Sequence, residues 1–379
     1  MTDASALGDG TRCVHAGLPI AVPGRPFLPG PMLASTYHLD PVAGPVTGVD
    51  GYGRPDNASR RSLEAAIGAL EGGECVAFAS GMAAVSATLL VLARTGDTVV
   101  VPTDGYYKTR AFAVGTLPRR GVPVVPVPTA GPYPSLMSVG MALLETPANP
   151  GLDVCDLAAL GTALHDAGVL VAVDNSTATP LGQRPLDLGA DLVVASGTKA
   201  LTGHADLLLG YVCTRSSELA ARIRDWRDTT GAIPGAFDCW LAHRSLATLD
   251  LRLARQAANA AALAELLASR PEVLSVRWPG LPSDPGYQVA ARQMRRMPGV
   301  LTFTLPSRGH VERFLGASRL VAAATSFGGV HTSADRRAQW GDDAPEGLVR
   351  LSCGIEDTAD LVADVEASLW RAPSRSGEP

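Results

Sequence analysis

A chain of 379 residues, 46% of them hydrophobic and 18% charged, can bury two or three domains' worth of core and is typical of globular rather than disordered proteins. Its formal charge of −5 argues against nucleic acid or an anionic membrane as a partner, because both require a concentrated basic surface. We therefore expect a small-molecule ligand.

The first fifty residues are rich in glycine and proline and show little periodicity, as in the segment GLPIAVPGRPFLPGPM. We predict that residues 1–50 form an extended arm that packs on something else, such as a partner subunit. The opening residues, MTDASALGDG, are polar and acidic, unlike a signal or transit peptide.

From residue 51 to residue 236 the pattern alternates between helix and strand. We expect helices at 62–73, 82–95 and 156–168, and strands at 75–80, 97–102, 142–147, 169–175 and 191–197. Uncharged β-branched runs between helices indicate a mostly parallel sheet covered on both faces, hence an α/β domain. The uncharged run 75–93 has the length of a membrane span, but Ser80 and Gly81 interrupt it, so a strand, a turn and a buried helix are favoured.

Residues 237–379 have a different texture. A long helical stretch is expected over 240–271, followed by apolar segments at 273–280, 299–306 and 348–357. We interpret this region as a smaller C-terminal α+β domain joined by a long helix. The six cysteines show no CxxC pair and no metal-ligand spacing with histidine, so we expect no metal site and reduced thiols in a cytoplasmic protein (Cys13, Cys75, Cys155, Cys213, Cys239 and Cys353).

Three ends of apolar runs carry candidate chemistry, because ligands in open α/β sheets bind beyond the carboxyl ends of the strands. Gly81 and Met82 open a helix directly after a strand, where backbone N–H groups can face an anion, although most such junctions bind nothing. Asp174 ends a second run and on its own would be a cap or turn residue. Lys199 ends a third apolar run and on its own would be interpreted as one member of a structural ion pair.

Lysine is scarce in this chain, since only Lys108 and Lys199 interrupt a set of 32 basic residues that is otherwise arginine. A source that favours arginine codons would produce the same scarcity. Arginine, however, cannot lose its proton near neutral pH, so it cannot replace lysine as an amine nucleophile.

The three run-ends together fit one ligand that has a phosphate, a cationic ring nitrogen and an aldehyde, which is pyridoxal 5′-phosphate. Lys199 would hold the aldehyde as a Schiff base, and Asp174 would keep the ring nitrogen protonated. The phosphate would be held by Gly81, Met82, Ser196 and Thr198. Two alternatives stay open: a cofactor-free Schiff-base aldolase that uses Lys199, and a non-catalytic binding protein of enzyme ancestry.

The chain also resembles the Cys/Met metabolism (transsulfuration) family of pyridoxal-phosphate enzymes over nearly its whole length. The matching segments, in order, are VHAG from Val14, STY from Ser35, YGRPDNAS from Tyr52, LEGGECVAFASGMAA, ETPANP, the run from Val171 to Asp206, SFGG and LVRLSCGIED. The resemblance implies the fold of type I pyridoxal-phosphate-dependent transferases and a homotetramer built from two active dimers.

The resemblance also implies roles for further residues. Tyr106 would stack on the cofactor ring and assist departure of the leaving group, and Tyr52 and Arg54 would reach the phosphate from the neighbouring subunit. Arg350 would clamp the substrate α-carboxylate. Asn149 and Ser326 would line the site. Without the resemblance, Tyr52 and Arg54 would be an ordinary loop pair and Arg350 part of a surface salt bridge.

The implied reaction is γ-elimination on a sulfur amino acid, as in the cystathionine γ-lyases, with methionine or homocysteine as further substrates. The alternatives are γ-replacement on an activated homoserine, of the cystathionine γ-synthase or homoserine sulfhydrylase type, and a methionine γ-lyase.

The chain departs from the lyase pattern at four places that we expect near the distal arm of the substrate: Gly51, the segment Asn57–Ser59, the pair Tyr107 and Lys108, and Thr325. Lys108 could recognise an anionic side group or point to solvent. His331 and Trp340 are expected to pack in the C-terminal domain, with the site entrance as the alternative.

Overall fold

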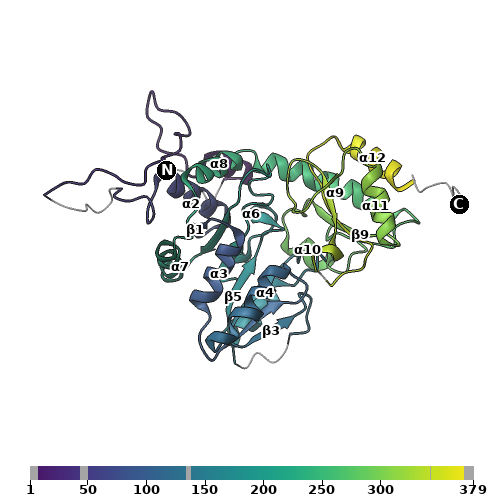
Figure 1. Cartoon of the computed structure of the whole chain (residues 1–379), viewed down its shortest axis with the longest axis horizontal. Helices are drawn as coiled ribbons and strands as arrows, with labels where there is room; N and C mark the ends of the chain where they lie inside the picture. Colours follow the sequence, from purple (N-terminus) through teal and green to yellow (C-terminus); the bar gives the residue numbers. More distant parts are fainter. Residues whose placement is uncertain (1–6, 43–49, 134–137, 342, 371–379) are drawn as a thin grey trace, which may run out of the picture.

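The computed structural model describes residues 7–42, 50–133, 138–341 and 343–370, which form two sheets with their helices (Figure 1). The larger sheet has the order β1-β7-β6-β5-β4-β2-β3. Its strands are β1 (Glu74–Phe78), β2 (Thr98–Pro102), β3 (Val124–Val127), β4 (Val139–Glu145), β5 (Leu170–Asp174), β6 (Leu192–Ala195) and β7 (Gly210–Thr214).

The larger sheet is mostly parallel, which confirms the predicted α/β class. Only β7 runs antiparallel, between β1 and β6. Neither β7 nor β3 was predicted from the sequence. The predicted strands and helices before residue 200 are otherwise present, with shifted ends. One example is α2 (Ala58–Glu71), which begins early because the Asn57 side chain caps it.

Helices cover both faces of this sheet, as continuous apolar strands require. Alternate residues of the strands pack on α2, α5 (Leu157–Asp166) and α8 (Ala236–Leu246). The intervening residues pack on α3 (Gly81–Leu92), α4 (Tyr107–Thr116) and α7 (Ser217–Thr230). The short α6 (Thr179–Gly182) follows β5. No helix within the described ranges combines the length and the apolar character needed to cross a bilayer.

The smaller sheet has the order β10-β11-β12-β9-β8 and is antiparallel except for the pair β10 and β11. Its strands are β8 (Ser275–Arg277), β9 (Val300–Thr304), β10 (Ala322–Ala323), β11 (Ser333–Arg336) and β12 (Leu348–Ser352). It is covered by helices α9 (Leu249–Ala268), α11 (Arg308–Ala317) and α12 (Thr358–Trp370). Helix α10 (Tyr287–Gln293) packs beside the start of α6, in the segment that follows β5. This is the predicted C-terminal α+β region.

The predicted single helix over 240–271 is wrong, because α8 ends at Leu246 and α9 begins at Leu249. The buried Arg252 binds backbone carbonyl groups at the break. Its Nη2 donates to the Ser245 carbonyl at 3.0 Å and to the Leu201 carbonyl at 3.1 Å, while its Nη1 donates to the Ala200 carbonyl at 2.8 Å. Arg252 thus anchors the start of α9 to the segment that follows β6.

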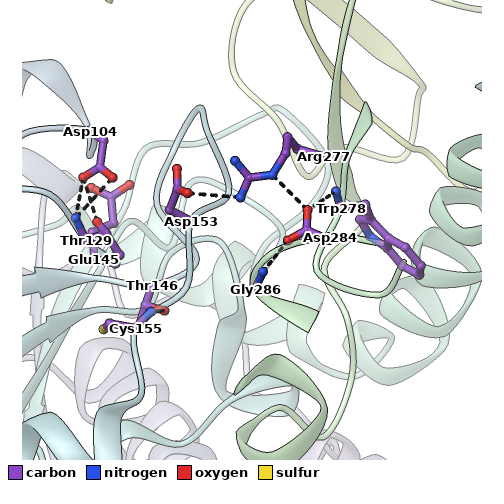
Figure 2. A network of polar contacts seen from close by, with 10 residues as sticks. All are labelled: Asp104, Thr129, Glu145, Thr146, Asp153, Cys155, Arg277, Trp278, Asp284 and Gly286. Carbon is purple, nitrogen blue, oxygen red and sulfur yellow. Dashed lines mark hydrogen bonds and ion pairs between the residues drawn. The ribbon is translucent and has the colours of Figure 1, made fainter. Parts of the chain in front are cut away.

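A polar network connects the two sheets. Figure 2 shows Arg277 of β8 between Asp153, in the loop after β4, and Asp284. The guanidinium group lies 3.1 Å from Asp153 Oδ1 and 3.0 Å from Asp284 Oδ2. The backbone N–H groups of Trp278 and Gly286 also donate to Asp284, so the carboxylate that holds Arg277 is itself fixed.

The N-terminal region is only partly an arm. Asp9–His15 forms helix α1, and Asp9 pairs with Arg12 of the same helix and with two arginines of the body, Arg184 and Arg295. After this helix the chain extends away from the body, as Figure 1 shows. Apolar side chains there face solvent, with Ile20 and Phe27 each 91% exposed.

Candidate active site

A cavity of about 480 Å³ lies where the carboxyl ends of β4, β5 and β6 and the start of α3 face the segments around β11 and β12. Ten of the twelve predicted site residues line it: Gly81, Met82, Tyr106, Asn149, Asp174, Ser196, Thr198, Lys199, Ser326 and Arg350. The fold therefore brings together residues that are up to 269 positions apart in the chain, from Gly81 to Arg350.

The turn before α3 forms one wall of this cavity. Ser80 caps the helix, accepting from the Ala83 N–H at 3.1 Å, while the first N–H groups of any helix lack intrahelical acceptors. Position 81 must be glycine, because an added Cβ would lie 2.7 Å from the Ser196 Cβ. The N–H groups of Gly81 and Met82 can therefore approach an anion closely beside the Ser196 hydroxyl.

Lys199 enters the cavity from the turn after β6. Thr198 fixes this turn, because its hydroxyl accepts from the Leu209 N–H at 2.9 Å. The Lys199 Nζ donates to Ser326 Oγ at 2.7 Å and lies 5.2 Å from the centre of the Phe327 ring. Burial, followed by the charge of Arg350, lowers the pKa of Lys199 from 10.5 to about 8.

This lowered pKa gives a testable stability effect. The unfolded chain binds the Lys199 proton more tightly, so the cofactor-free protein should gain stability as the pH rises from about 8 to about 10.5. Below that window the buried charge costs roughly 3 kcal/mol. Lys199→Met should therefore unfold at higher urea concentration than the unmodified chain at pH 7, with a gap that narrows toward pH 10.5. Lys108→Met serves as the control, and a pH-independent gap would contradict the assignment.

Two carboxylates occupy neighbouring strand ends, since Glu145 of β4 and Asp174 of β5 are register partners. Burial raises the pKa of Asp174, while hydrogen bonds from Ser176 and the charge of Lys199 oppose the rise. Burial, followed by repulsion from Asp174, raises the pKa of Glu145 well above its ordinary value. A cation placed beside Asp174 would lower its pKa again.

Glu145 joins two loops of the site. Its Oε2 accepts from the Tyr106 N–H at 2.7 Å, and its Oε1 accepts from the Asn149 N–H at 2.8 Å. Figure 2 shows the same residue beside Thr129, whose hydroxyl lies 3.4 Å from the Glu145 carbonyl oxygen. Glu145 was not predicted, although it ends an apolar run, the signal that identified Asp174.

Replacing Glu145 with glutamine should weaken cofactor binding on the order of tenfold. A glutamine side chain has one oxygen that accepts and one NH2 group that only donates. The N–H of either Tyr106 or Asn149 would therefore lose its acceptor. Equilibrium titration of the protein with cofactor measures the change. Glu218→Gln, on the exposed start of α7, is the matched control, and equal affinities in both variants would contradict the role of Glu145.

Arg350 reaches the cavity from β12 and is nearly buried, with 4% of its surface exposed. Its Nη1 donates to Asn149 Oδ1 at 2.7 Å, and its Nη2 donates to the Ser326 carbonyl at 3.0 Å. It also lies 3.3 Å from Asp335. A guanidinium group fixed from several sides is suited to hold a carboxylate in one orientation.

Tyr52 and Arg54 do not line this cavity. Tyr52 is 49% exposed, and the Arg54 guanidinium lies 5.7 Å from its ring centre and donates to the Asp228 carbonyl. Tyr106, by contrast, lines the cavity and makes an edge contact with Tyr107, with ring centres 5.3 Å apart.

The four departures from the lyase pattern divide in the same way. Thr325 and Tyr107 line the cavity, whereas Gly51 and Asn57 do not, and Asn57 is buried as the cap of α2. Lys108 is exposed, and its Nζ lies over the Tyr107 ring at 5.0 Å.

The C-terminal region contributes more to the cavity than the sequence indicated. Trp340 lines it, so the prediction that this residue packs only within the C-terminal domain is wrong, while His331 is exposed and lies outside the lining. Arg337 and Phe327 also line the cavity and were not predicted. No local pattern marks Arg337, because only the tertiary fold turns its segment toward Lys199.

The residues present fit pyridoxal phosphate. The glycine turn offers N–H groups to an anion, the buried Asp174 suits a protonated ring nitrogen, and Lys199 is an amine whose pKa is lowered to about 8. All three face one cavity, together with the aromatic side chain of Tyr106.

Comparison with known proteins agrees with this site. The family model of the Cys/Met metabolism PLP-dependent enzymes matches residues 29–370. A Streptomyces coelicolor protein named "Putative cystathionine gamma-lyase" is 54% identical, covering 97% of this chain and 94% of that protein. A cystathionine gamma-synthase of Mycobacterium tuberculosis is 39% identical, covering 96% and 97%. The crystal structure of metB from Corynebacterium glutamicum has a TM-score of 0.92 at 32% identity, covering 97% and 99%. The chain therefore belongs to the Cys/Met metabolism family of pyridoxal-phosphate-dependent enzymes.

Proposed function

We propose that the enzyme catalyses γ-elimination on a sulfur amino acid, with cystathionine as its first substrate. The reaction would break the bond between Cγ and sulfur and, with one water, give 2-oxobutanoate, ammonia and a free thiol. The observation that carries the proposal is the 54% identity, over almost the whole chain, to a protein with a cystathionine gamma-lyase name. The presence of Lys199, Asp174 and Arg350 in the lining of one cavity supports it.

Bound pyridoxal phosphate would supply an aldehyde for the amino group and a ring that accepts an electron pair. Gly81, Met82, Ser196 and Thr198 would hold its phosphate, and Asp174 would keep the proton on its ring nitrogen. Arg350, oriented by Asn149 and Ser326, would bind the α-carboxylate of the substrate.

Lys199 would move the protons. Its pKa near 8 leaves part of the amine neutral at neutral pH, so Nζ can take the proton from the substrate's α-carbon and return it elsewhere. The Ser326 hydroxyl at 2.7 Å holds the amine in place. Lys199 would next take a β-proton, and the sulfur would leave Cγ as a thiolate with the electron pair of the Cγ–S bond and be protonated to the free thiol. Tyr106, which lines the cavity, would assist this departure.

The second candidate is γ-replacement, which the 39% identity to a cystathionine gamma-synthase favours. An assay of the purified enzyme distinguishes the two reactions. The substrates are cystathionine, methionine, homocysteine and acylated homoserines, each with and without cysteine. Release of 2-oxobutanoate and thiol from cystathionine without an added nucleophile would support the lyase. Product formation only in the presence of cysteine would replace this proposal with the transferase.

We propose further that two copies of the chain complete each site. Tyr52 and Arg54 lie outside the cavity of their own chain, and apolar side chains such as Ile20 and Phe27 are exposed nearby in sequence. In a symmetric dimer these residues would reach the cofactor phosphate of the neighbouring subunit, and two such dimers would form the tetramer.

Mixed subunits test this assembly. Arg54→Gln alone should bind the cofactor on the order of tenfold more weakly, and Lys199→Ala alone should be inactive. When the two variants are co-expressed, roughly half of the dimers contain one copy of each. One of the two sites in a mixed dimer then has both Lys199 and Arg54, which should restore roughly a quarter of the activity. No restoration in purified mixed dimers would show that Arg54 serves its own chain.

The six cysteines are buried and free of disulfides, as suits a reducing compartment, and we propose a cytoplasmic location.

A further inference from the structure

The cavity has two chemically different walls. The wall from the larger sheet carries the predicted cofactor contacts, including Gly81, Asp174 and Ser196. The opposite wall comes from the C-terminal region and consists of Thr325, Ser326, Phe327, Arg337, Trp340 and Arg350. A substrate that reacts between these walls must place its side chain along the second.

Arg337 is the charged residue of this wall for which the proposed reaction gives no role. It begins the short 3-10 helix Arg337–Trp340 directly after β11, and 3% of its surface is exposed. Its Nη1 lies 2.9 Å from Asp335 Oδ2, and Arg350 lies 3.3 Å from the other oxygen of Asp335. Asp335 of β11 and Arg350 of β12 are register partners, so the two guanidinium groups flank one carboxylate.

The charge of Arg337 reaches the reacting end of the cavity. Arg350 and Arg337 both contribute to lowering the pKa of Lys199, although burial is the larger cause. Among the described lining residues, the acidic ones are Asp174 and Glu145, and both belong to the opposite wall. Glu145 is held there by two backbone N–H groups and Asp174 by the Ser176 N–H.

We propose that Arg337 binds a second anionic group at the far end of the substrate. The preferred substrates are then γ-substituted amino acids whose leaving group carries a carboxylate. This inference rests on the proposed γ-chemistry and specifies its substrate class. Arg350 would take the α-carboxylate. A carboxylate at the far end of the side chain would add a charge-assisted hydrogen bond to Arg337, beside the one that Arg337 makes with Asp335, and a neutral side chain cannot add such a bond. Trp340 and Thr325, which line the same wall, would contact the linking atoms of the side chain.

A matched pair of substrates tests this specificity. O-succinyl-L-homoserine and O-acetyl-L-homoserine share their reacting bond, but only the succinyl group ends in a carboxylate. We expect kcat/KM to favour the succinyl ester on the order of tenfold, mainly through KM. Arg337→Gln should remove this preference. The readout is the ratio of the two kcat/KM values, because Arg337 also shares Asp335 with Arg350 and acts on Lys199, so turnover of both esters can change. Arg336→Gln, one residue earlier and outside the cavity lining, should retain it.

A binding measurement separates recognition from chemistry. L-2-aminoadipate and L-norleucine have side chains of similar length and no γ-leaving group, and only the first has a distal carboxylate. Competitive inhibition constants should favour aminoadipate in the unmodified enzyme and equalise in Arg337→Gln, while Arg337→Lys should keep part of the preference.

The outcomes are distinguishable. If cystathionine and both esters release no 2-oxobutanoate and accept no thiol, the proposed γ-chemistry fails. If cystathionine reacts and neither ester does, the inhibitor pair decides the role of Arg337. If both esters react but the unmodified enzyme shows no preference for the carboxylate in either pair, or Arg337→Gln preserves the preference, the role of Arg337 is overturned.

Discussion

Replacing Lys199 with alanine should lower the turnover number about 10³-fold or more, the largest effect we expect in this chain. The variant loses the amine that moves the α-proton and also the covalent attachment point for the cofactor. Steady-state release of 2-oxobutanoate measures the first loss, and the visible absorbance of the purified protein reports the second.

The matched control is Lys108→Ala, which removes the other lysine of the chain. Lys108 is exposed and lies outside the cavity lining, so activity and absorbance should match the unmodified enzyme. A Lys199→Ala protein that stays yellow and turns over normally would refute the assignment of Lys199, whatever the fate of the control.

Replacing Asp174 with asparagine should lower turnover by about 10²-fold to 10³-fold while leaving Lys199 in place. An amide cannot hold the charge that keeps the ring nitrogen protonated, so the ring would accept the electron pair less readily. The side chain keeps its size, and the hydrogen bond from the Ser176 N–H, 2.9 Å long, can persist to the amide oxygen.

This loss should appear in kcat rather than in cofactor occupancy, which separates it from the effect at Lys199. The visible absorbance of the bound cofactor should shift without disappearing. Asp166→Asn, on the exposed end of α5, makes the same chemical change away from the site and should be silent. A normal kcat in Asp174→Asn would exclude Asp174 as the partner of the ring nitrogen.

The sequence predicted that the three run-ends lie together, and they line one cavity for a physical reason. In a parallel sheet the ends of apolar runs meet at one edge, so Gly81, Asp174 and Lys199 could be placed together without knowing the strand order. Glu145 obeys the same rule and could have been found by it. Strand β7 was missed because an antiparallel strand of five residues breaks the alternation that identified its neighbours.

The wall that comes from the C-terminal region could not be predicted in this way. Arg337 and Trp340 lie in a segment without periodicity, and they line the cavity only because the smaller sheet turns its β11 end toward Lys199. The break between α8 and α9 was hidden as well, since Ala247 and Thr248 interrupt a helical composition without glycine or proline. At the break the Ser245 carbonyl accepts hydrogen bonds from the Thr248 N–H and from the Arg252 side chain, which the composition does not indicate.

That arginine has a mechanical consequence. Arg252 sits near the start of α9, which leads into the smaller sheet, and it binds the carbonyl groups of Ala200 and Leu201, the residues directly after Lys199. A tilt of the smaller sheet on its connecting helix would thus pull on the backbone beside the reactive amine. If a substrate bound to Arg350 moved the smaller sheet toward the larger one, the Arg252 hydrogen bonds would transmit that movement to the backbone beside Lys199.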